Sequence, residues 1–309
     1  MDRLWNDEAE ATDPAEYWVK RVQSAGRYRL KDTKKRAPYK PLLLLWLIGR
    51  LAEGRPPSVS FREAEEQLRP LLNRYRVADS KPKVEHPFVY LASDPELWGV
   101  RDSAGADVRR MSPAKKLSPP FLREEATGTL APGFALVLQD PGVRSRVVNA
   151  LLEMEFPETQ HEGILQEFKL DHLVVPVQSP RDPNFRATVL RAYEDRCAFC
   201  GYDLRLGGSP VGIDAAHVQM RKRGGPDRIE NGLALCVQHH RLFDFGALGL
   251  DQDHCILVSE HLSLSDQDSA ANIRSLVGTR MRKPLRRYRL PASERIDWHN
   301  KNLFKHPAR

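Results

Sequence analysis

The chain has 309 residues, a length that predicts about two domains, and 41% of them are hydrophobic, enough to form packed cores. Its formal charge is +7 and its pI is about 9.3, so we expect attraction to polyanions such as nucleic acid or an anionic membrane surface. The longest apolar run, residues 42–48, is too short to cross a bilayer, which excludes a membrane-spanning helix there.

The amino terminus and the cysteines indicate a reducing compartment. Residues 1–10 are acidic and mixed, without a basic segment followed by an apolar stretch, so no secretory signal is predicted. Four cysteines are too few for a disulfide scaffold, and three of them stand at metal-ligand spacing. We therefore expect a cytoplasmic protein with no membrane partner.

Residues 1–160 are predicted to form one domain. Residues 20–40 carry nine Lys and Arg against one acid, and Pro41 then opens an apolar helix, a position where proline is tolerated. Ser60 is a predicted N-cap, and Glu63 completes a capping box. In chain order we expect helices at 14–23, 41–51 and 60–73, a turn at 86–88, a strand at 98–100, a basic stretch at 109–123 and a helix at 143–156.

The second half is predicted to begin after a proline-containing connection. Residues 158–182 are polar and then apolar, and we assign 161–184 as the linker and 185–309 as the second domain. A short helix at 185–193 leads into Cys197. Residues 280–309 carry ten Lys and Arg against two acids and are predicted to be a basic C-terminal tail.

Two residue pairs predict a structural metal site. Cys197 and Cys200 are separated by two residues, and Cys236 and His239 have the same spacing. Two such knuckles can present four ligands tetrahedrally, which is the arrangement of a closed zinc site. We therefore predict that Cys197, Cys200, Cys236 and His239 bind a structural Zn²⁺.

Between and just after the knuckles lie three further candidates, in the order strand, loop, helix: His217, Asn231 and His240. Hydrolysis of a phosphodiester needs a base to activate water and a cation to stabilise the developing charge. A histidine titrates near neutral pH, so we assign His217 as the general base. We assign His240 as a ligand of a catalytic divalent metal, Mg²⁺ or Mn²⁺, and Asn231 as the residue that orients the base or braces the loop.

Over about residues 197–244 the chain resembles the HNH endonuclease superfamily, in its zinc-stapled branch. That resemblance implies a ββα-metal fold and DNA cleavage. One position departs from the pattern, because many HNH enzymes have Asp, Glu or His directly before the strand histidine, where this chain has Ala216. Asp214, two residues before Ala216, is the nearest alternative metal ligand.

A second resemblance covers roughly residues 15–160. The run Ala-Pro-Tyr-Lys-Pro at 37–41, followed by four leucines, and the later His86-Pro87-Phe88 are similar to the sulfur-binding domain of phosphorothioate-dependent restriction endonucleases. In that family an HNH domain follows the sulfur-binding domain, so the layout also matches.

The second resemblance implies where DNA is read. It places His86 and Pro87 in the wall of a sulfur-accepting cup, and Tyr39 and Lys40 at the adjacent phosphate and bases. Arg109, Arg110 and Ser112 are candidates for a later basic element. A shallow apolar cup favours sulfur, which is softer and less hydrated than the oxygen that it replaces.

Together these observations predict an α+β protein. We expect a mainly helical N-terminal domain with a small sheet that reads DNA, and a C-terminal HNH domain of ββα-metal type. The leading hypothesis is a modification-dependent endonuclease, similar to type IV enzymes, that cuts double-stranded, phosphorothioated DNA. Two alternatives remain open: an HNH endonuclease for methylated or unmodified DNA, and a DNA-binding protein with an inactive HNH module. A homodimer would supply the two active sites that a double-strand cut needs.

Overall fold

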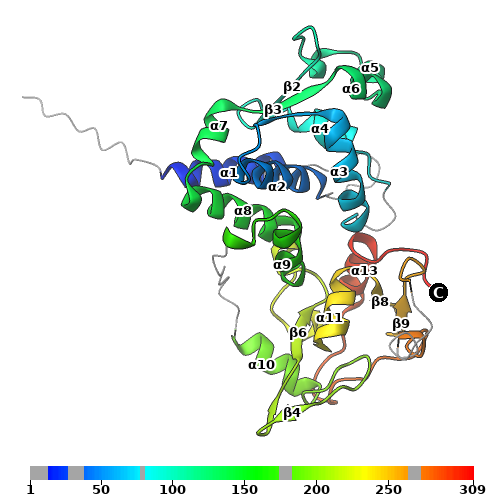
Figure 1. Cartoon of the computed structure of the whole chain (residues 1–309). Coiled ribbons are helices and arrows are strands. Elements are labelled where there is room, and N and C mark those ends of the chain that lie inside the picture. Colours follow the sequence, from blue (N-terminus) through cyan, green and yellow to red (C-terminus); the bar gives the residue numbers. More distant parts are fainter. Residues whose placement is uncertain (1–12, 27–37, 77–80, 174–182, 264–272) are drawn as a thin grey trace, which may run out of the picture.

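The computed structural model describes residues 13–26, 38–76, 81–173, 183–263 and 273–309 (Figure 1). Two separate hydrophobic cores are present: the first contains buried residues from Val22 to Leu173, and the second from Phe185 to Ile296. Within the described residues, helices dominate the first part, and four small antiparallel sheets are distributed over both. The predicted α+β class is confirmed.

The first core surrounds α2 (Tyr39–Ala52), which follows α1 (Pro14–Gly26). Every residue of α2 from its start to Leu51 is buried, because the helix is apolar on all sides and other helices cover it. Gly49 allows the closest approach: a Cβ there would lie 2.3 Å from the backbone oxygen of Phe168. The chain around Phe168 is therefore packed directly on the central helix.

A three-stranded sheet lies against these helices, in the order β1 (Ser58–Ser60), β3 (Thr127–Leu130), β2 (Trp98–Arg101). Trp98 is fully buried, and its indole nitrogen donates to the backbone oxygen of Phe88 at 2.8 Å. This bond ties the sheet to α4 (Glu85–Leu91).

The remaining elements of the first part complete its helical layers. Ser60 caps α3 and accepts the backbone N–H of Glu63, as predicted, while the Glu63 carboxylate pairs with Arg50. The other elements are α3 (Phe61–Arg74), η1 (Val108–Arg110), α5 (Pro113–Lys116), α6 (Pro119–Glu125), α7 (Pro132–Val137), α8 (Pro141–Glu155), α9 (Glu158–Glu167) and η2 (Asp171–Leu173).

The second core is built around a strand pair and a helix. Strands β6 (Ile213–His217) and β7 (Gly232–Cys236) pair in antiparallel register from Ile213 opposite Cys236 to His217 opposite Gly232. Helix α11 (Val237–Asp244) follows β7 directly and packs on both strands. The predicted strand, strand and helix of a ββα unit are thus present.

Further elements surround this unit. Helix α10 (Pro183–Ala192) packs against β6 and β7 on the way to Cys197. The others are β4 (Arg205–Leu206), β5 (Ser209–Pro210), η3 (Arg221–Arg223), η4 (Ile229–Asn231), β8 (Leu248–Leu250), β9 (Ile256–Val258) and α13 (Ser293–Asn302).

Two expectations from the sequence need correction. The segment at 86–88 is not a turn but lies within α4, since a proline in the first turn of a helix interrupts no hydrogen bond. The segment 280–309, expected as a basic C-terminal tail, is part of the folded structure: it includes α13, and Ile296 and Phe304 are buried.

The segment assigned as a linker, 161–184, contains folded parts. Ile164, Phe168 and Leu173 belong to the first core, while residues 174–182 lie outside the described residues. The boundary between the domains stays a prediction. No described helix has the length and apolarity to cross a membrane.

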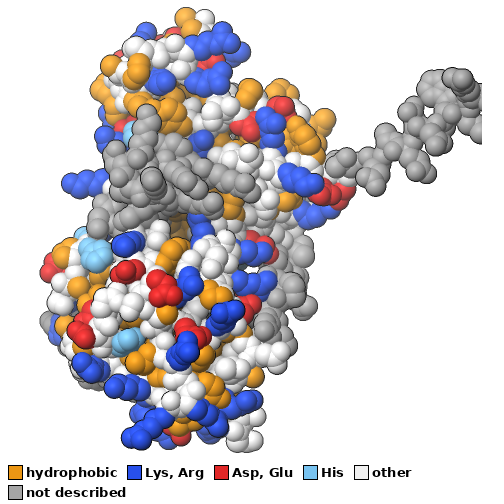
Figure 2. All heavy atoms as spheres, turned by 180° about the vertical axis from the view of Figure 1, so that it is seen from behind, with side chains coloured by type: hydrophobic (Ala, Val, Ile, Leu, Met, Phe, Trp, Pro, Cys, Tyr) orange, Lys and Arg blue, Asp and Glu red, His pale blue; other side chains and the backbone are white. Residues whose placement is uncertain are grey.

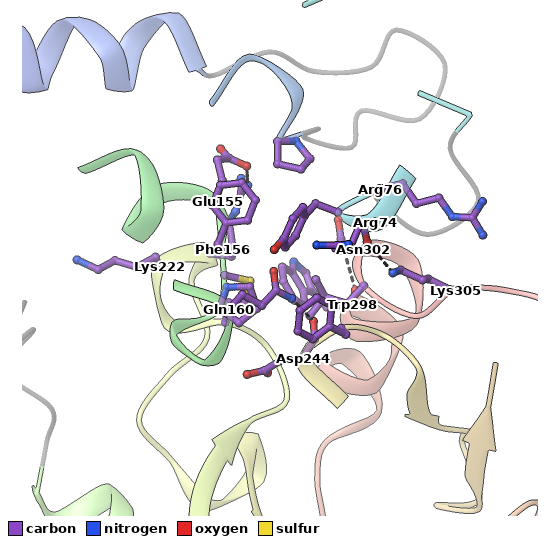
Figure 3. A pocket seen from close by; sticks show the side chains of 17 residues that line it. Arg74, Arg76, Glu155, Phe156, Gln160, Lys222, Asp244, Trp298, Asn302 and Lys305 are labelled. Atoms are coloured by element: carbon purple, nitrogen blue, oxygen red, sulfur yellow. Dashed lines mark hydrogen bonds and ion pairs between the residues drawn. The ribbon is translucent and has the colours of Figure 1, made fainter. Parts of the chain in front are cut away.

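The two cores meet along a polar seam. Glu155 of α8 forms a buried ion pair with Arg223, and the Lys305 amine donates to the backbone oxygen of Arg74 at 2.8 Å. A cavity of about 330 Å³ lies in this seam, with Arg74, Arg76 and Lys305 on one side and Lys222 on the other (Figure 3). The first and second parts are therefore joined by specific contacts as well as by the chain.

Candidate active site and metal centre

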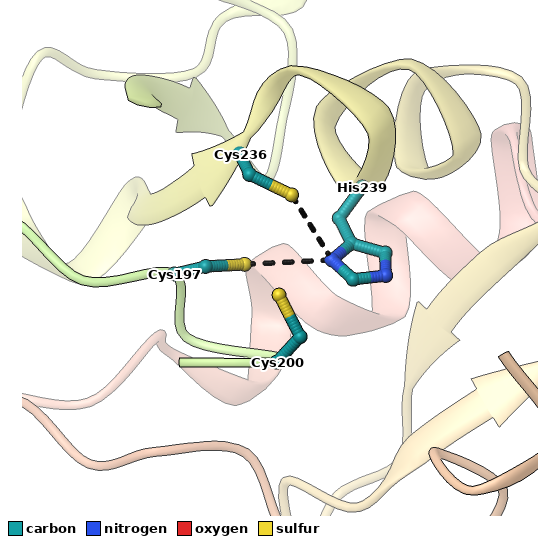
Figure 4. A group of neighbouring side chains, drawn as sticks. All are labelled: Cys197, Cys200, Cys236 and His239. Carbon is teal, nitrogen blue, oxygen red and sulfur yellow. Dashed lines mark hydrogen bonds between the residues drawn. The ribbon is translucent and has the colours of Figure 1, made fainter. Parts of the chain in front are cut away.

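The four residues of the predicted zinc site lie together. Their ligand atoms are all within 4.8 Å of one another. Among the described residues, no other group of three or more His, Cys, Asp or Glu side chains is arranged so that it could hold a metal ion. His239 Nδ1 lies 3.5 Å from Cys197 Sγ and 3.3 Å from Cys236 Sγ (Figure 4). A tetrahedral zinc with bonds of about 2.3 Å to sulfur and 2.0–2.1 Å to nitrogen would separate such atoms by about 3.6 Å.

The electrostatics of the thiols also fit a metal. Hydrogen bonds from Cys200 and then from Cys236 lower the pKa of the Cys197 thiol, against the effect of burial. The hydrogen bond with Cys197 raises the pKa of Cys236. The ionisation of Cys197 and that of Cys236 are therefore linked. A bound metal would remove the remaining thiol protons.

His217 stands at the end of β6 with two partners. Its Nε2 lies 2.7 Å from Asp227 Oδ1, and its ring stacks on Phe185 with centroids 4.2 Å apart. Burial lowers the pKa of His217, although Asp227 raises it. The ring is therefore neutral at pH 7 and held in one orientation, both of which a general base needs.

His240 lies on α11 and shares one helical face with Asp244. His240 Nε2 is 3.5 Å from Asp244 Oδ2, four residues further along the helix. Asp244 is buried, and burial raises the pKa of its carboxyl. The hydroxyl of Thr159, at the start of α9, donates to the same carboxylate, so a residue from the first part of the chain contacts this pair.

A cavity of about 360 Å³ joins these groups. Its walls include His217, His240 and Asp214 from the second core and Thr159 and His161 from α9. Asp214 thus lines the predicted site, although its carboxylate is 3.1 Å from Nε of Arg186. The cavity brings the predicted base and the predicted metal ligand to one place.

Asn231 makes contacts that brace the loop. It is fully buried, its Oδ1 accepts the backbone N–H of Gln219 at 2.7 Å, and its Nδ2 donates to the oxygens of Gln219 and Pro226 at 2.9 and 3.0 Å. A Cβ at Gly225 would lie 1.9 Å from the Gln219 oxygen, so only glycine fits there. These bonds shape the turn that carries Asp227.

Ala216, the departure from the HNH pattern, is fully buried in the second core. Its side chain is part of the packing between the strands and their neighbours, so this position could not present a charged ligand without disturbing the core. If the site holds a catalytic metal, a second protein ligand would have to come from elsewhere.

The candidates in the first part lie on adjacent elements. α4 packs against both α2 and η1, which brings the segments with Lys40, His86 and Arg109 into one region. Tyr39, Lys40 and Pro87 are buried, and His86 is half-buried with its ring 5.8 Å from that of Tyr90. Burial lowers the pKa of both Lys40 and His86.

The later basic candidates are more exposed. Arg109 and Arg110 both lie near the Asp107 carboxylate, at 3.7 and 3.5 Å. Ser112 caps α5 and accepts the backbone N–H of Lys115 at 3.4 Å. A cavity of about 420 Å³ beside η1 is lined by Arg110, together with Arg101, Ala106, Asp107 and Met111.

Reasoning from the sequence missed four residues of the second site. These are Phe185, Asp227, Asp244 and Thr159. Asp244 could have been found, because a histidine and a carboxylate four apart on a predicted helix share a face. Asp227 and Phe185 contact His217 only through the fold, and nothing in the local pattern marks them.

The comparisons with known proteins cover both parts of the chain. A family described as "ScoMcrA-like, DNA sulfur-binding domain" matches residues 19–173, and one described as "HNH endonuclease" matches residues 197–251. No curated protein matches the chain.

Among solved structures, the chain is similar to the sulfur-binding domain of SprMcrA complexed with phosphorothioated DNA. The identity is 24% and the TM-score 0.43, covering 53% of this chain and 98% of that one. The sulfur-binding domain of ScoMcrA, also complexed with phosphorothioated DNA, is 23% identical with a TM-score of 0.38. The match covers 51% of this chain and 98% of that one. The modification-dependent TagI restriction endonuclease is 19% identical with a TM-score of 0.29. The match covers 72% of this chain and 68% of that one.

The family assignment follows from the first of the two family matches, because it spans half of the chain. The zinc-type cluster and the ββα unit fall within the second match. The chain therefore belongs to the family of proteins with a ScoMcrA-like DNA sulfur-binding domain, joined here to an HNH endonuclease domain.

Proposed function

We propose that the protein is a modification-dependent DNA endonuclease that captures phosphorothioated DNA with its first domain and hydrolyses a nearby phosphodiester with its second. The observation that carries the proposal is the pairing of His217 with Asp227, at 2.7 Å, on the wall of a cavity that His240 also lines. This arrangement joins an oriented base to a candidate metal ligand in a chain that carries a DNA-reading domain.

His217 acts as the general base in this proposal. The Asp227 carboxylate accepts the hydrogen on Nε2, which leaves Nδ1 as the atom that takes a proton from water. Stacking on Phe185 keeps the ring plane fixed while the proton moves. Asp227 then stabilises the imidazolium that forms.

His240 and Asp244 are the residues that we propose to hold a catalytic divalent metal. Their ligand atoms are 3.5 Å apart, whereas neighbouring ligands of an octahedral ion with bonds of about 2.1 Å lie about 3.0 Å apart, so the two side chains would close by about 0.5 Å around the ion. Asp214 remains a candidate, but its pairing with Arg186 makes Asp244 the better one. When bound, Mg²⁺ or Mn²⁺ would supply stabilisation of charge on the phosphorane and on the leaving 3′ oxygen.

The first domain is proposed to select the modified DNA. His86 and Pro87 would line the cup for sulfur, and the lowered pKa of His86 keeps that ring uncharged at pH 7, as contact with a poorly hydrated atom requires. Tyr39 and Lys40 would contact the adjacent phosphate and bases, with Arg109, Arg110 and Ser112 close by. The Lys40 side chain is buried, and its amine lies 3.5 Å from the Ser93 hydroxyl.

Three further points belong to the proposal. Zn²⁺ is the ion that suits three thiols and an imidazole in a closed site. Cytoplasmic location fits free thiols and a DNA substrate. A homodimer would bring together the two HNH sites that a double-strand cut needs.

Matched duplexes test the proposal directly. One duplex carries a phosphorothioate of Rp configuration and the other is plain, and each is incubated with the protein and Mg²⁺ or Mn²⁺. We expect cutting of the sulfur-containing duplex and little cutting of the plain one. Equal cutting of both would contradict sulfur selection, and binding without cutting under every metal would indicate an inactive nuclease module.

A further inference from the structure

The segment 282–289 carries five Lys and Arg residues and no acid, and the proposed cleavage chemistry does not use it. We call it the basic strip. Its cations are Arg282, Lys283, Arg286, Arg287 and Arg289, and all five side chains are exposed. Figure 2 shows Lys and Arg gathered at the lower end of the molecule, the end at which β4 lies in Figure 1.

The strip is fixed in place by its backbone. The N–H of Arg282 donates to the oxygen of Ala198 at 2.7 Å, and that of Leu285 to the oxygen of Ala192 at 2.8 Å. Pro284 is buried between the cations, and Met281 is buried directly before the strip. The apolar positions thus anchor the segment to the nuclease domain and leave its charges facing outward.

The strip runs from the zinc-type cluster towards the reaction site. It begins beside Ala198, between two cysteine ligands, and the chain after it donates from Ala292 to the oxygen of Glu230 at 2.9 Å. Glu230 directly precedes Asn231, whose side chain braces the turn with Asp227. A ligand lying along the strip would therefore pass close to the loop that holds the general base in position.

The charges of the strip are mostly not neutralised by the protein. Among the described residues, no carboxylate forms an ion pair with Lys283, Arg286 or Arg287, whereas Arg289 lies 3.5 Å from Glu230. By contrast, Lys301 on α13 pairs with Asp297. Exposed cations without acidic partners, held on a rigid backbone, suit a polyanion with regularly spaced charges.

We propose that the basic strip is a second DNA-binding surface, which holds the sugar-phosphate backbone of the duplex beside the cut site. The strip has eight residues and includes a turn in which the N–H of Tyr288 donates to the oxygen of Leu285 at 2.8 Å, so it spans less than about 29 Å, the distance that eight extended residues would reach. One DNA strand presents a phosphate about every 3.4 Å of helix axis, so the strip can contact several phosphates within one helical turn. It adds affinity without reading sequence or sulfur, and it orients the duplex over the nuclease domain.

The test uses the full chain with three Gln substitutions, Lys283→Gln, Arg286→Gln and Arg287→Gln. A matched control removes the same charge elsewhere, at Lys20, Lys169 and Lys301, all exposed and ion-paired. Fluorescence anisotropy measures the binding of a plain duplex and of its phosphorothioated counterpart over a range of salt. Zinc content and thermal melting verify that each variant is folded.

Each lost phosphate contact lowers the slope of log affinity against log salt by about 0.9, so we expect a decrease of about 2.7 for the strip variant. From about 50 to about 200 mM salt, the wild type would then lose about 40-fold more affinity than the strip variant. In the control variant, the slope should change by less than about 0.9, the value for one phosphate contact. If the triple variant fails to fold, Arg286→Gln alone should still lower the slope by about 0.9.

Two results would overturn the inference. One is an equal change of slope in the strip and control variants, which would mean that only net charge matters. The other is a strip variant that loses binding to phosphatidylserine vesicles but keeps its affinity for DNA. The inference rests on the proposed function only in taking DNA as the substrate. If the wild type shows no preference for sulfur, the proposed selection fails, while the plain duplex still tests the strip.

Discussion

His239 lies 4% exposed among three thiols, whereas its neighbour His240 lines an open cavity opposite His217. The first histidine completes a set of four ligand atoms within 4.8 Å, all from two short sequence motifs. The second has one carboxylate at 3.5 Å, and its surroundings come from the strand pair, a turn and the first domain. A closed site is thus encoded locally, while a site that must admit water and phosphate is assembled from distant residues.

The closed site gives the largest expected effect. Cys236→Ser should prevent metal binding and unfold the second domain, because structural zinc in small domains contributes roughly 10 kcal/mol or more to folding. Circular dichroism and zinc content measure this loss. Cys255→Ser is the control, since Cys255 lies outside the cluster. A Cys236→Ser protein that melts like the wild type would show that the cluster does not hold this domain together.

The open site is expected to fail without unfolding. His217→Ala should lower the cleavage rate by about 10²- to 10⁴-fold, the usual contribution of a general base, while zinc content and DNA binding stay unchanged. His161→Ala is a matched control, because His161 lines the same cavity but binds the backbone oxygen of Phe156. Similar losses in both variants would remove the distinction between a base and a cavity-lining histidine.

The same contrast explains what the sequence could predict. The ligand pairs at 197–200 and 236–239 are separated by two residues each, so spacing alone gives the zinc-type site. The order of His217, Asn231 and His240 predicts a strand, a loop and a helix, and the resemblance to HNH endonucleases implies the ββα unit. Asp227 could not be assigned, because its contact with His217 depends on how Asn231 and Gly225 shape the intervening turn.

Two parts of the fold could not be predicted from the sequence, for related reasons. A proline usually suggests a turn, but Pro87 lies in the first turn of α4, where its missing N–H costs nothing. In the segment 280–309, ten Lys and Arg dominate the charge pattern, and only the fold shows that Ile296 and Phe304 are buried. In both segments the most prominent local feature, a proline or a run of cations, favoured an irregular structure, whereas the tertiary packing produced a folded one.

The pH dependence of cleavage tests how the open site controls its base. A protonated His217 cannot accept the proton of water, so the rate should fall as the pH drops through its pKa. Burial lowers that pKa, which places the acid limb of the profile below about 6.5. Asp227 raises the pKa, so Asp227→Asn should move the limb to still lower pH.

Asp227→Asn should also reduce the plateau rate by about 10- to 100-fold, the range seen when a carboxylate that orients a functional histidine is removed. Asp214→Asn is the comparison, since this carboxylate lines the cavity but pairs with Arg186. It should leave the acid limb in place. A limb that moves to higher pH in Asp227→Asn would exclude His217 as the group that titrates.

The smallest effect concerns the contact between the domains. The Thr159 hydroxyl donates to the Asp244 carboxylate beside His240, so the sulfur-binding domain supplies a partner to the proposed metal ligand. Thr159→Val removes this bond, and a loss of about 1.4 kcal/mol would raise the metal concentration for half-maximal cleavage about tenfold. Thr159→Ser keeps the hydroxyl and should restore the wild-type value. If Val and Ser variants need the same metal concentration, the open site does not depend on this contact, and its ligands are set within the second domain alone.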